Sequence, residues 1–274
     1  MKIKQRYAFT NNRQLWRILI SGTNKVIVED RDVDHKQVFF NCLQAETGNF
    51  IFRNLQLEEK FWIGIEVIYK DIIYFHKFAK PDMPNHKEII AFDINSQKIL
   101  WKNDSYAFLF VHDDKVYTYK PKFEGRNFYA LDYLSGEELE SLGDDAFAIN
   151  QIRNSINIEE EYKDYLFPNI FSDDTIIDID TKQIILDLSG GFEIQGNIEF
   201  IRYKDILLFN YYAKASEIIF INRFIAVDTS KRKIIFEEIL NSTANAYVPD
   251  SFFMKDNLVF LLKEKKELKV FAIE

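Results

Sequence analysis

The sequence contains a single cysteine, Cys42, so the chain cannot form an internal disulfide bond. Cys42 lies in an apolar strand-like stretch, and we expect it to be a small buried hydrophobe rather than a reactive thiol. No apolar run approaches the length that crosses a bilayer, and no signal-peptide core follows the basic residues at the N-terminus. We therefore expect a cytoplasmic protein without a membrane span.

The chain also lacks a strongly basic surface. Its net charge is −8 and its basic clusters, such as Lys231–Lys233, are short. Because binding to a phosphate backbone needs a positive stripe, this composition argues against a nucleic-acid partner. The remaining partner classes are a protein or a small anionic ligand, and the anion would be held by loop cations such as Arg31, Lys77, Lys87 and Lys122.

Sequence signatures of catalysis are missing as well. There is no nucleophile elbow, no phosphate-binding glycine loop and no paired Cys/His ligand set. We therefore predict no cofactor and no metal, and we favour a non-catalytic protein.

A repeated hairpin motif is present: an apolar pair, an acidic or polar residue, a tight polar turn and a second apolar run. We align the copies on two positions: the residue before the turn and the residue eight positions later. The resulting pairs are Gln44 with Phe52, Asp93 with Trp101, Asp132 with Glu140, Asp178 with Leu186, and Asp228 with Phe236. A period of about 40–50 residues is typical of four-stranded propeller blades. The short runs rich in Ile, Phe, Tyr and Val predict strands, and one repeat predicts strands over 63–69, 71–78, 88–92 and 98–102.

The two chain ends complete the count. The chain stops on the first half of the motif at Val270–Glu274, and the second half occurs at Arg13–Arg17. We predict an all-β protein, a six-bladed β-propeller of four-stranded antiparallel blades, whose ring is closed by the N-terminal strand pairing with the C-terminal blade. Residues 1–274 would form a single domain, with blade 6 composed of about 240–274 plus 1–20. Trp16 and Trp101 would pack between neighbouring blades.

One stretch fits the repeat less well, and one alternative fold stays open. A helical turn is predicted over 158–165, inside the stretch Leu142–Phe167 that departs most from the pattern. An irregular β-sandwich or two small β domains would also contain such hairpins, since Asp-containing turns are common.

The hairpin Ala91–Trp101 resembles the repeat of quinoprotein-type β-propellers, as do the Thr47-Gly48 and Ser135-Gly136 turns. The resemblance implies the propeller fold. It does not carry over the quinone cofactor, because those enzymes are exported and generally have eight blades. The stretches Leu15–Ile18, Glu29–Arg31, Glu58–Gly64 and His76–Asp93 are similar to a bacterial family of unknown function, which implies no catalytic residues.

The candidate site lies on the face that carries the loops between the second and third strands of each blade and the linkers between blades. The ligand-binding candidates are Arg31, His35, Glu59, His76, His86 and Lys87. A metal would use the three histidines with Asp32, Asp82 or Glu59, but their spacing matches no compact ligand motif. We therefore expect a scaffold that binds a protein or small ligand through the loop face of blades 1–3. The alternative is a hydrolase or lyase with a polar or metal-assisted site at the central channel mouth.

Overall fold

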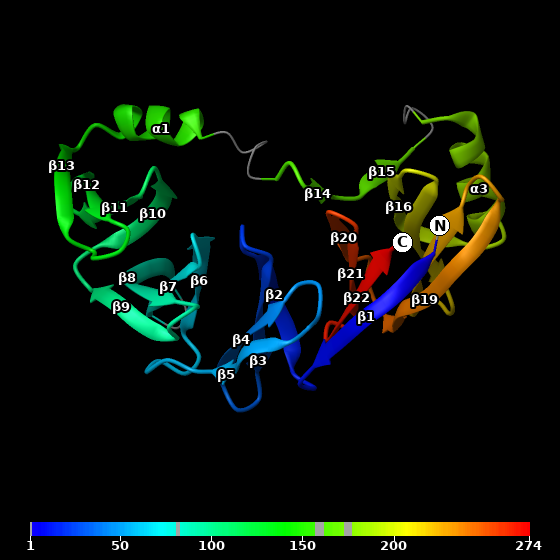
Figure 1. Cartoon of the computed structure of the whole chain (residues 1–274), viewed down its shortest axis with the longest axis horizontal. Coiled ribbons are helices and arrows are strands. Elements are labelled where there is room, and N and C mark those ends of the chain that lie inside the picture. The colour runs from blue at the N-terminus through cyan, green and yellow to red at the C-terminus, as the bar shows by residue number, and fades with distance from the viewer. Residues whose placement is uncertain (1, 81–82, 157–161, 173–176) are drawn as a thin grey trace. The chain divides into compact units, whose positions relative to one another are not determined.

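The computed structural model describes residues 2–80, 83–156, 162–172 and 177–274. The chain divides into two compact units. We call Arg13–Glu161 the three-sheet unit, and Met1–Asn12 with Tyr162–Glu274 the two-sheet unit. Each is built of antiparallel sheets (Figure 1), so the predicted all-β class is confirmed.

The three-sheet unit contains three four-stranded sheets, each with its strands paired in chain order. The first sheet consists of β2 (Gln14–Ile20), β3 (Lys25–Asp32), β4 (Gln37–Gln44) and β5 (Phe50–Leu55). The second consists of β6 (Ile63–Tyr69), β7 (Ile72–Lys80), β8 (Met83–Asp93) and β9 (Lys98–Asn103). The third consists of β10 (Ala107–His112), β11 (Lys115–Pro121), β12 (Arg126–Asp132) and β13 (Glu138–Gly143). The second sheet lies close to its predicted strands.

The predicted hairpin turns form at Asp93 and Asp132. Each carboxylate accepts hydrogen bonds from the backbone N–H groups two and three residues later, at 3.3 and 2.9 Å for Asp93 and 3.0 and 2.7 Å for Asp132. This local bond offers the chain a turn that needs no distant partner, which is why aspartate marks the turn in the sequence.

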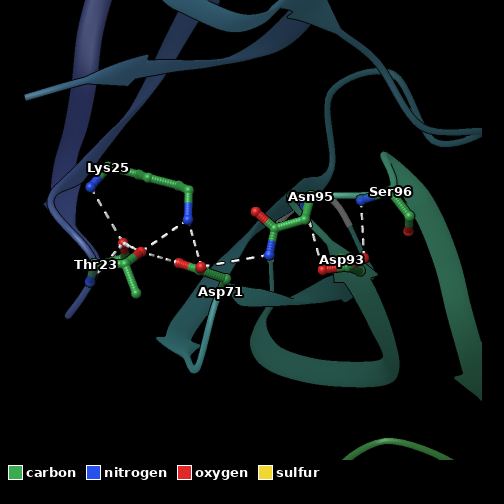
Figure 2. A network of polar contacts seen from close by, with 7 residues as sticks. Thr23, Lys25, Asp71, Asp93, Asn95 and Ser96 are labelled. Carbon is green, nitrogen blue, oxygen red and sulfur yellow. Dashed lines mark hydrogen bonds and ion pairs between the residues drawn. The ribbon is translucent and has the colours of Figure 1, made fainter.

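A buried ion pair joins the first and second sheets at the turn end of their strands (Figure 2). Lys25 of β3 binds Asp71, which follows β6, and its ammonium group also donates to Thr23 at 2.8 Å. Asn95 of the β8–β9 turn donates to the same Asp71 carboxylate at 3.4 Å. Because both charges are almost fully buried, loss of one partner would leave the other uncompensated.

Trp101 packs between the second and third sheets, as the repeat predicts. It is buried, and its indole N–H donates to the backbone oxygen of Tyr133 at 3.2 Å. A methyl group on Gly136 would lie 2.5 Å from the indole ring, so this turn accepts only glycine beside the tryptophan.

The two-sheet unit contains two five-stranded sheets. The fourth sheet runs in chain order through β15 (Asn169–Phe171), β16 (Ile194–Tyr203), β17 (Ile206–Lys214), β18 (Phe220–Asp228) and β19 (Lys233–Ala244). The fifth sheet has the order β1 (Ile3–Thr10), β22 (Glu267–Ile273), β21 (Leu258–Lys263), β20 (Phe252–Lys255) and β14 (Tyr165–Leu166).

The N-terminal strand does pair with the C-terminal sheet. β1 lies antiparallel to β22, with Ile3 opposite Ile273 and Thr10 opposite Glu267 (Figure 1). The strand that pairs is Ile3–Thr10, however, whereas the prediction assigned this role to Arg13–Arg17. That stretch belongs to β2 of the first sheet, where Trp16 is 57% exposed instead of packed between sheets. The predicted composition of blade 6 is wrong in this respect.

The predicted hairpin at Asp178 is a helix. α3 (Ile179–Ser189) begins there, and the Asp178 carboxylate accepts from the N–H of Thr181 at 2.8 Å. An aspartate caps a helix with the same local bond that it uses in a hairpin turn, so the pattern could not distinguish the two. The described residues form five sheets, so the predicted count of six blades is not confirmed.

A second helix, α1 (Ala146–Ser155), occupies the stretch that departs from the repeat, with Asp145 as its N-cap. Residues 158–161 of the predicted helical turn lie outside the described residues. Across the described part of the chain, no helix has the length and apolar character needed to cross a membrane. Cys42 is fully buried, as predicted, and burial raises the pKa of its thiol to about 12.

Candidate functional site

Three strands of the second sheet bring Glu66, His76 and His86 together. Glu66 is the extra residue of a β-bulge in β6, because the register shifts between Ile65 and Val67. A bulge turns a side chain away from the direction that strict alternation would give it. A second register shift, between β7 and β8, follows His76. The two bulges therefore decide which side chains share this face of the sheet.

The two histidines are diagonal neighbours across β7 and β8. His86 lies opposite Phe78 in the register, and His76 is two residues from Phe78 on the same face. The imidazole rings stack with their centroids 3.5 Å apart and their planes 6° from parallel. Phe78 meets both rings edge-on, at 5.0 and 5.5 Å, which holds the pair in place.

Glu66 faces both imidazoles. Its Oε1 lies 2.6 Å from Nδ1 of His86 and 3.1 Å from Nδ1 of His76. The His86 contact is a hydrogen bond. Neither ring nitrogen of buried His76 makes a well-directed one, so its contact with Glu66 is mainly electrostatic.

The group is buried at one end and open at the other. His76 is 4% exposed, the Glu66 side chain 14% and the His86 side chain 37%. Solvent therefore reaches the cluster from the His86 side.

The electrostatics of the cluster keep Glu66 ionised. Burial acts to raise the pKa of its carboxyl, but contact with His76 and the charges of His76 and His86 outweigh burial, and the net pKa is lowered. The cluster thus combines an anionic oxygen with two imidazole nitrogens.

Arg31, a predicted ligand residue, has a structural role. Its guanidinium binds Glu29 at 2.7–2.8 Å and donates to the backbone oxygens of Phe61 and Ile63 at 3.1 and 2.8 Å. These bonds tie the first sheet to the segment that enters β6. Because Glu29 neutralises its charge, Arg31 is poorly suited to binding an anionic ligand.

Gly64 lets the cluster approach the backbone of β6. It lies opposite His76 in the register, and a methyl group there would be 3.1 and 3.2 Å from Cε1 and Nε2 of the imidazole. The same methyl would be 3.9 Å from Nη2 of Arg31, which places the guanidinium beside the cluster.

The other three predicted residues stand apart from this arrangement. Glu59 accepts two backbone N–H bonds at 3.0 Å in the linker before β6. Burial acts to raise its pKa, but these backbone bonds outweigh it and lower the net pKa. His35 pairs with Asp32 at 2.9 Å in the β3–β4 turn, and Lys87 is exposed on β8.

The structure thus unites two of the predicted residues, His76 and His86, with one that was missed. The sequence does contain a signal for Glu66, because it is the one acidic residue in the otherwise apolar predicted strand Ile63–Tyr69. Asp82, weighed as a ligand, lies outside the described residues.

A second buried glutamate, Glu199 of β16, lies in the two-sheet unit. It accepts from the Tyr247 hydroxyl at 2.9 Å and from the backbone N–H of Asp250 at 3.3 Å. Its Oε2 and the Oδ1 of Asn210, opposite it on β17, both lack a hydrogen-bond partner. Burial raises the pKa of Glu199 above its ordinary value, so the protonated form is favoured more than in an exposed glutamate.

Comparison with known proteins gives a family without an assigned function. Residues 20–101 match the model of a domain of unknown function (DUF4905), a stretch that includes Glu66, His76 and His86. No curated protein matches the chain.

Solved structures that align with the chain share little sequence with it. A member of the DUF4221 family from Bacteroides vulgatus is 8% identical, with a TM-score of 0.36, over 100% of this chain and 96% of that one. A europium-containing methanol dehydrogenase is 12% identical, with a TM-score of 0.33, over 96% of this chain and 52% of that one. The β-propeller domain of the trilobed protease from Pyrococcus furiosus is 12% identical, with a TM-score of 0.31, over 92% and 64%. The chain thus spans about half the length of the dehydrogenase, and over residues 20–101 it is similar to a domain of unknown function.

Proposed function

We propose that this protein is a non-catalytic scaffold that binds a small ligand at the Glu66, His76 and His86 cluster. The single observation that carries the proposal is His76, a nearly fully buried side chain whose Nε2 has no hydrogen-bond partner and whose Nδ1 has only its poorly directed contact with Glu66. A buried polar group without a partner costs free energy. A ligand that enters beside half-exposed His86 would supply the missing interaction.

Charge at the cluster supports a cationic ligand over the anionic one predicted. Arg31 is paired with Glu29, and Lys77 is paired with Glu88 at 2.8 Å. Two of the four cations invoked for an anion site are thereby neutralised. The cluster itself contributes a carboxylate, which attracts positive charge, and two imidazoles, which offer a lone pair to a cation when they are neutral.

The scaffold in this proposal is a β-propeller. The four-stranded sheets in chain order, the aspartate turns and the packing of Trp101 under Gly136 support it. The closed ring, its count of six blades and the single domain over 1–274 stay predictions, as does a cytoplasmic location.

The sequence-based alternative is a hydrolase or lyase with a metal-assisted site. It would use the same cluster, because two histidines and a carboxylate also serve catalytic metal ions. Turnover of ester, phosphoester or sugar substrates that is lost in His86→Gln would support this enzyme and contradict the non-catalytic scaffold.

The ligand-binding proposal can be tested by NMR of the histidine side chains in the full chain. The four histidines allow an internal control, since His35 and His112 lie outside the cluster. The probes are zinc sulfate, inorganic phosphate and citrate. We expect at least one probe to shift the His76 and His86 signals saturably while His35 and His112 stay unchanged. Equal shifts at all four histidines, or none with any probe, would contradict the proposal.

A further inference from the structure

We infer that Glu66, His76 and His86 form a binding site for a divalent first-row transition metal ion such as zinc. The inference rests on the proposed ligand-binding role of the cluster and names the ligand's class. Among the described residues, these three present one carboxylate oxygen and two imidazole nitrogens within 4.8 Å of one another. The metal site weighed from the sequence contained His76 and His86 but not Glu66.

The donor atoms select the class of metal. Imidazole nitrogen with carboxylate oxygen suits zinc and its first-row neighbours, whereas calcium and magnesium prefer sites made of oxygen alone. Glu66 brings a carboxylate, which supplies negative charge to the ion that it binds. An ion would bind the nitrogen lone pairs and displace any proton that they carry.

The spacing of the donors also fits. Ligands of a tetrahedral zinc ion lie roughly 3.3 Å apart, given metal–ligand distances of about 2.0–2.1 Å. The Glu66 oxygen lies 2.6 Å from Nδ1 of His86 and 3.1 Å from Nδ1 of His76. To hold an ion, the carboxylate would move back by less than about 1 Å, and the stacked imidazoles would tilt so that their lone pairs converge.

The cluster is built to hold its geometry. All three residues stand on strands of one sheet, and two bulges set the directions of their side chains. Phe78 packs against both imidazoles, and Gly64 removes the side chain that would press on His76. Folding already restricts these three side chains, so metal binding costs little further conformational entropy.

The site would also be accessible and incomplete. The His86 side chain is 37% exposed, which provides a route for an ion from solvent. Three protein ligands leave a coordination position for water or a further group, unlike a closed structural site with four.

Isothermal titration of the full, chelator-treated chain with zinc tests this inference. We expect one zinc ion per chain and no competition from calcium or magnesium. His86→Gln should weaken binding by about tenfold or more, and so should Glu66→Gln, which keeps the shape of the side chain and removes its charge. When cobalt replaces zinc, the protein should show a visible absorption spectrum, and both variants should lack this spectrum.

His35→Gln is the matched control. His35 also faces a carboxylate, that of Asp32 at 2.9 Å, but lies outside the three-residue cluster. It should bind zinc like the original chain. Melting temperatures in chelator show whether each variant folds; His86 is the least buried ligand, so His86→Gln gives a result even where Glu66→Gln is unstable.

Three outcomes would overturn the inference: no zinc binding, unchanged affinity in His86→Gln, or an equal loss in His35→Gln. The NMR experiment separates this inference from the proposed function. If citrate or phosphate shifts His76 and His86 but zinc does not, the metal site is wrong and ligand binding stands. If no probe shifts them, both fall.

Discussion

Glu66 and Glu199 are both largely buried glutamates on strands of antiparallel sheets, yet their pKa values shift in opposite directions. Glu66 faces two imidazoles, and its pKa is lowered in spite of burial. Glu199 faces a tyrosine hydroxyl, a backbone N–H and an asparagine, and burial raises its pKa. The contrast teaches that burial alone does not set the state of a carboxyl group; the charge that its neighbours can carry decides. The charged form is thus favoured at Glu66 and disfavoured at Glu199, relative to an exposed glutamate.

The largest expected difference between the two glutamates is their response to zinc. At about 100 times its dissociation constant, an ion that binds only the folded state stabilises it by about 2.7 kcal/mol. Urea unfolding of Glu199→Gln should show this gain, and Glu66→Gln should not. A gain of equal size in both variants would place the zinc elsewhere.

Each cluster contains a glycine whose replacement sharpens the comparison. A methyl on Gly196 would lie 2.6 Å from the Tyr247 ring, and its φ is +74°, so Gly196→Ala should cost about 2 kcal/mol. Gly64→Ala meets only the edge of His76 at 3.1 Å and should cost about 1 kcal/mol.

The two glycine variants should also separate in zinc titrations. Gly64→Ala should weaken zinc binding by displacing the His76 ring, and Gly196→Ala should leave it unchanged wherever the protein is folded. Unfolding curves and zinc isotherms of both variants check this pair. Full zinc affinity in Gly64→Ala would show that the position of the His76 ring does not matter.

In chelator at neutral pH, the same isosteric change should have opposite signs at the two sites. Glu66→Gln removes the charge that faces two imidazoles and should lower the free energy of unfolding by about 1 kcal/mol. Glu199→Gln places an amide N–H where Oε2 lacks a partner and should raise it by about 1 kcal/mol. Urea denaturation measures both, and a shift of the same sign would remove the contrast.

The smallest effect is the pH dependence at Glu199. Its folded pKa is raised above the ordinary 4.5, so its stability contribution is fully present below that value and is lost as pH rises through the folded pKa. Glu199→Gln cannot ionise, so its advantage over the original chain should be small at about pH 4 and larger at about pH 7. An advantage that shrinks as pH rises would mean that the folded pKa of Glu199 is lowered instead of raised.

Much of the local structure could be predicted from the sequence. Short runs rich in Ile, Phe, Tyr and Val predicted the strands of the second sheet, and the turns at Asp93 and Asp132 form as expected because each is closed by bonds within three residues. The same chemistry at Asp178 caps a helix. At that position the local signal was correct, but packing against the fourth sheet decided that the aspartate begins a helix instead of a hairpin turn.

The candidate site was only half predictable, because it depends on register. His76 and His86 were expected on one loop face, yet His86 lies on β8, whereas Arg31 and Glu59 proved to hydrogen-bond backbone atoms of the linker before β6. Glu66 would point elsewhere in a regular strand, and only the bulge at Ile65 and Val67 brings it to the histidines. A bulge arises from pairing with the next strand, which no window of sequence contains.

The class of structure and the aspartate turns could be predicted from the sequence, because runs of β-branched and aromatic residues and side-chain-to-backbone bonds act between near neighbours in the chain. Tertiary structure alone decided which strand pairs with β22, which aspartate begins a helix and which acid meets the two imidazoles. The reason is physical: strand register, burial and the charge state of a buried carboxyl are set by residues distant in sequence, and these contacts exist only once the sheets have formed.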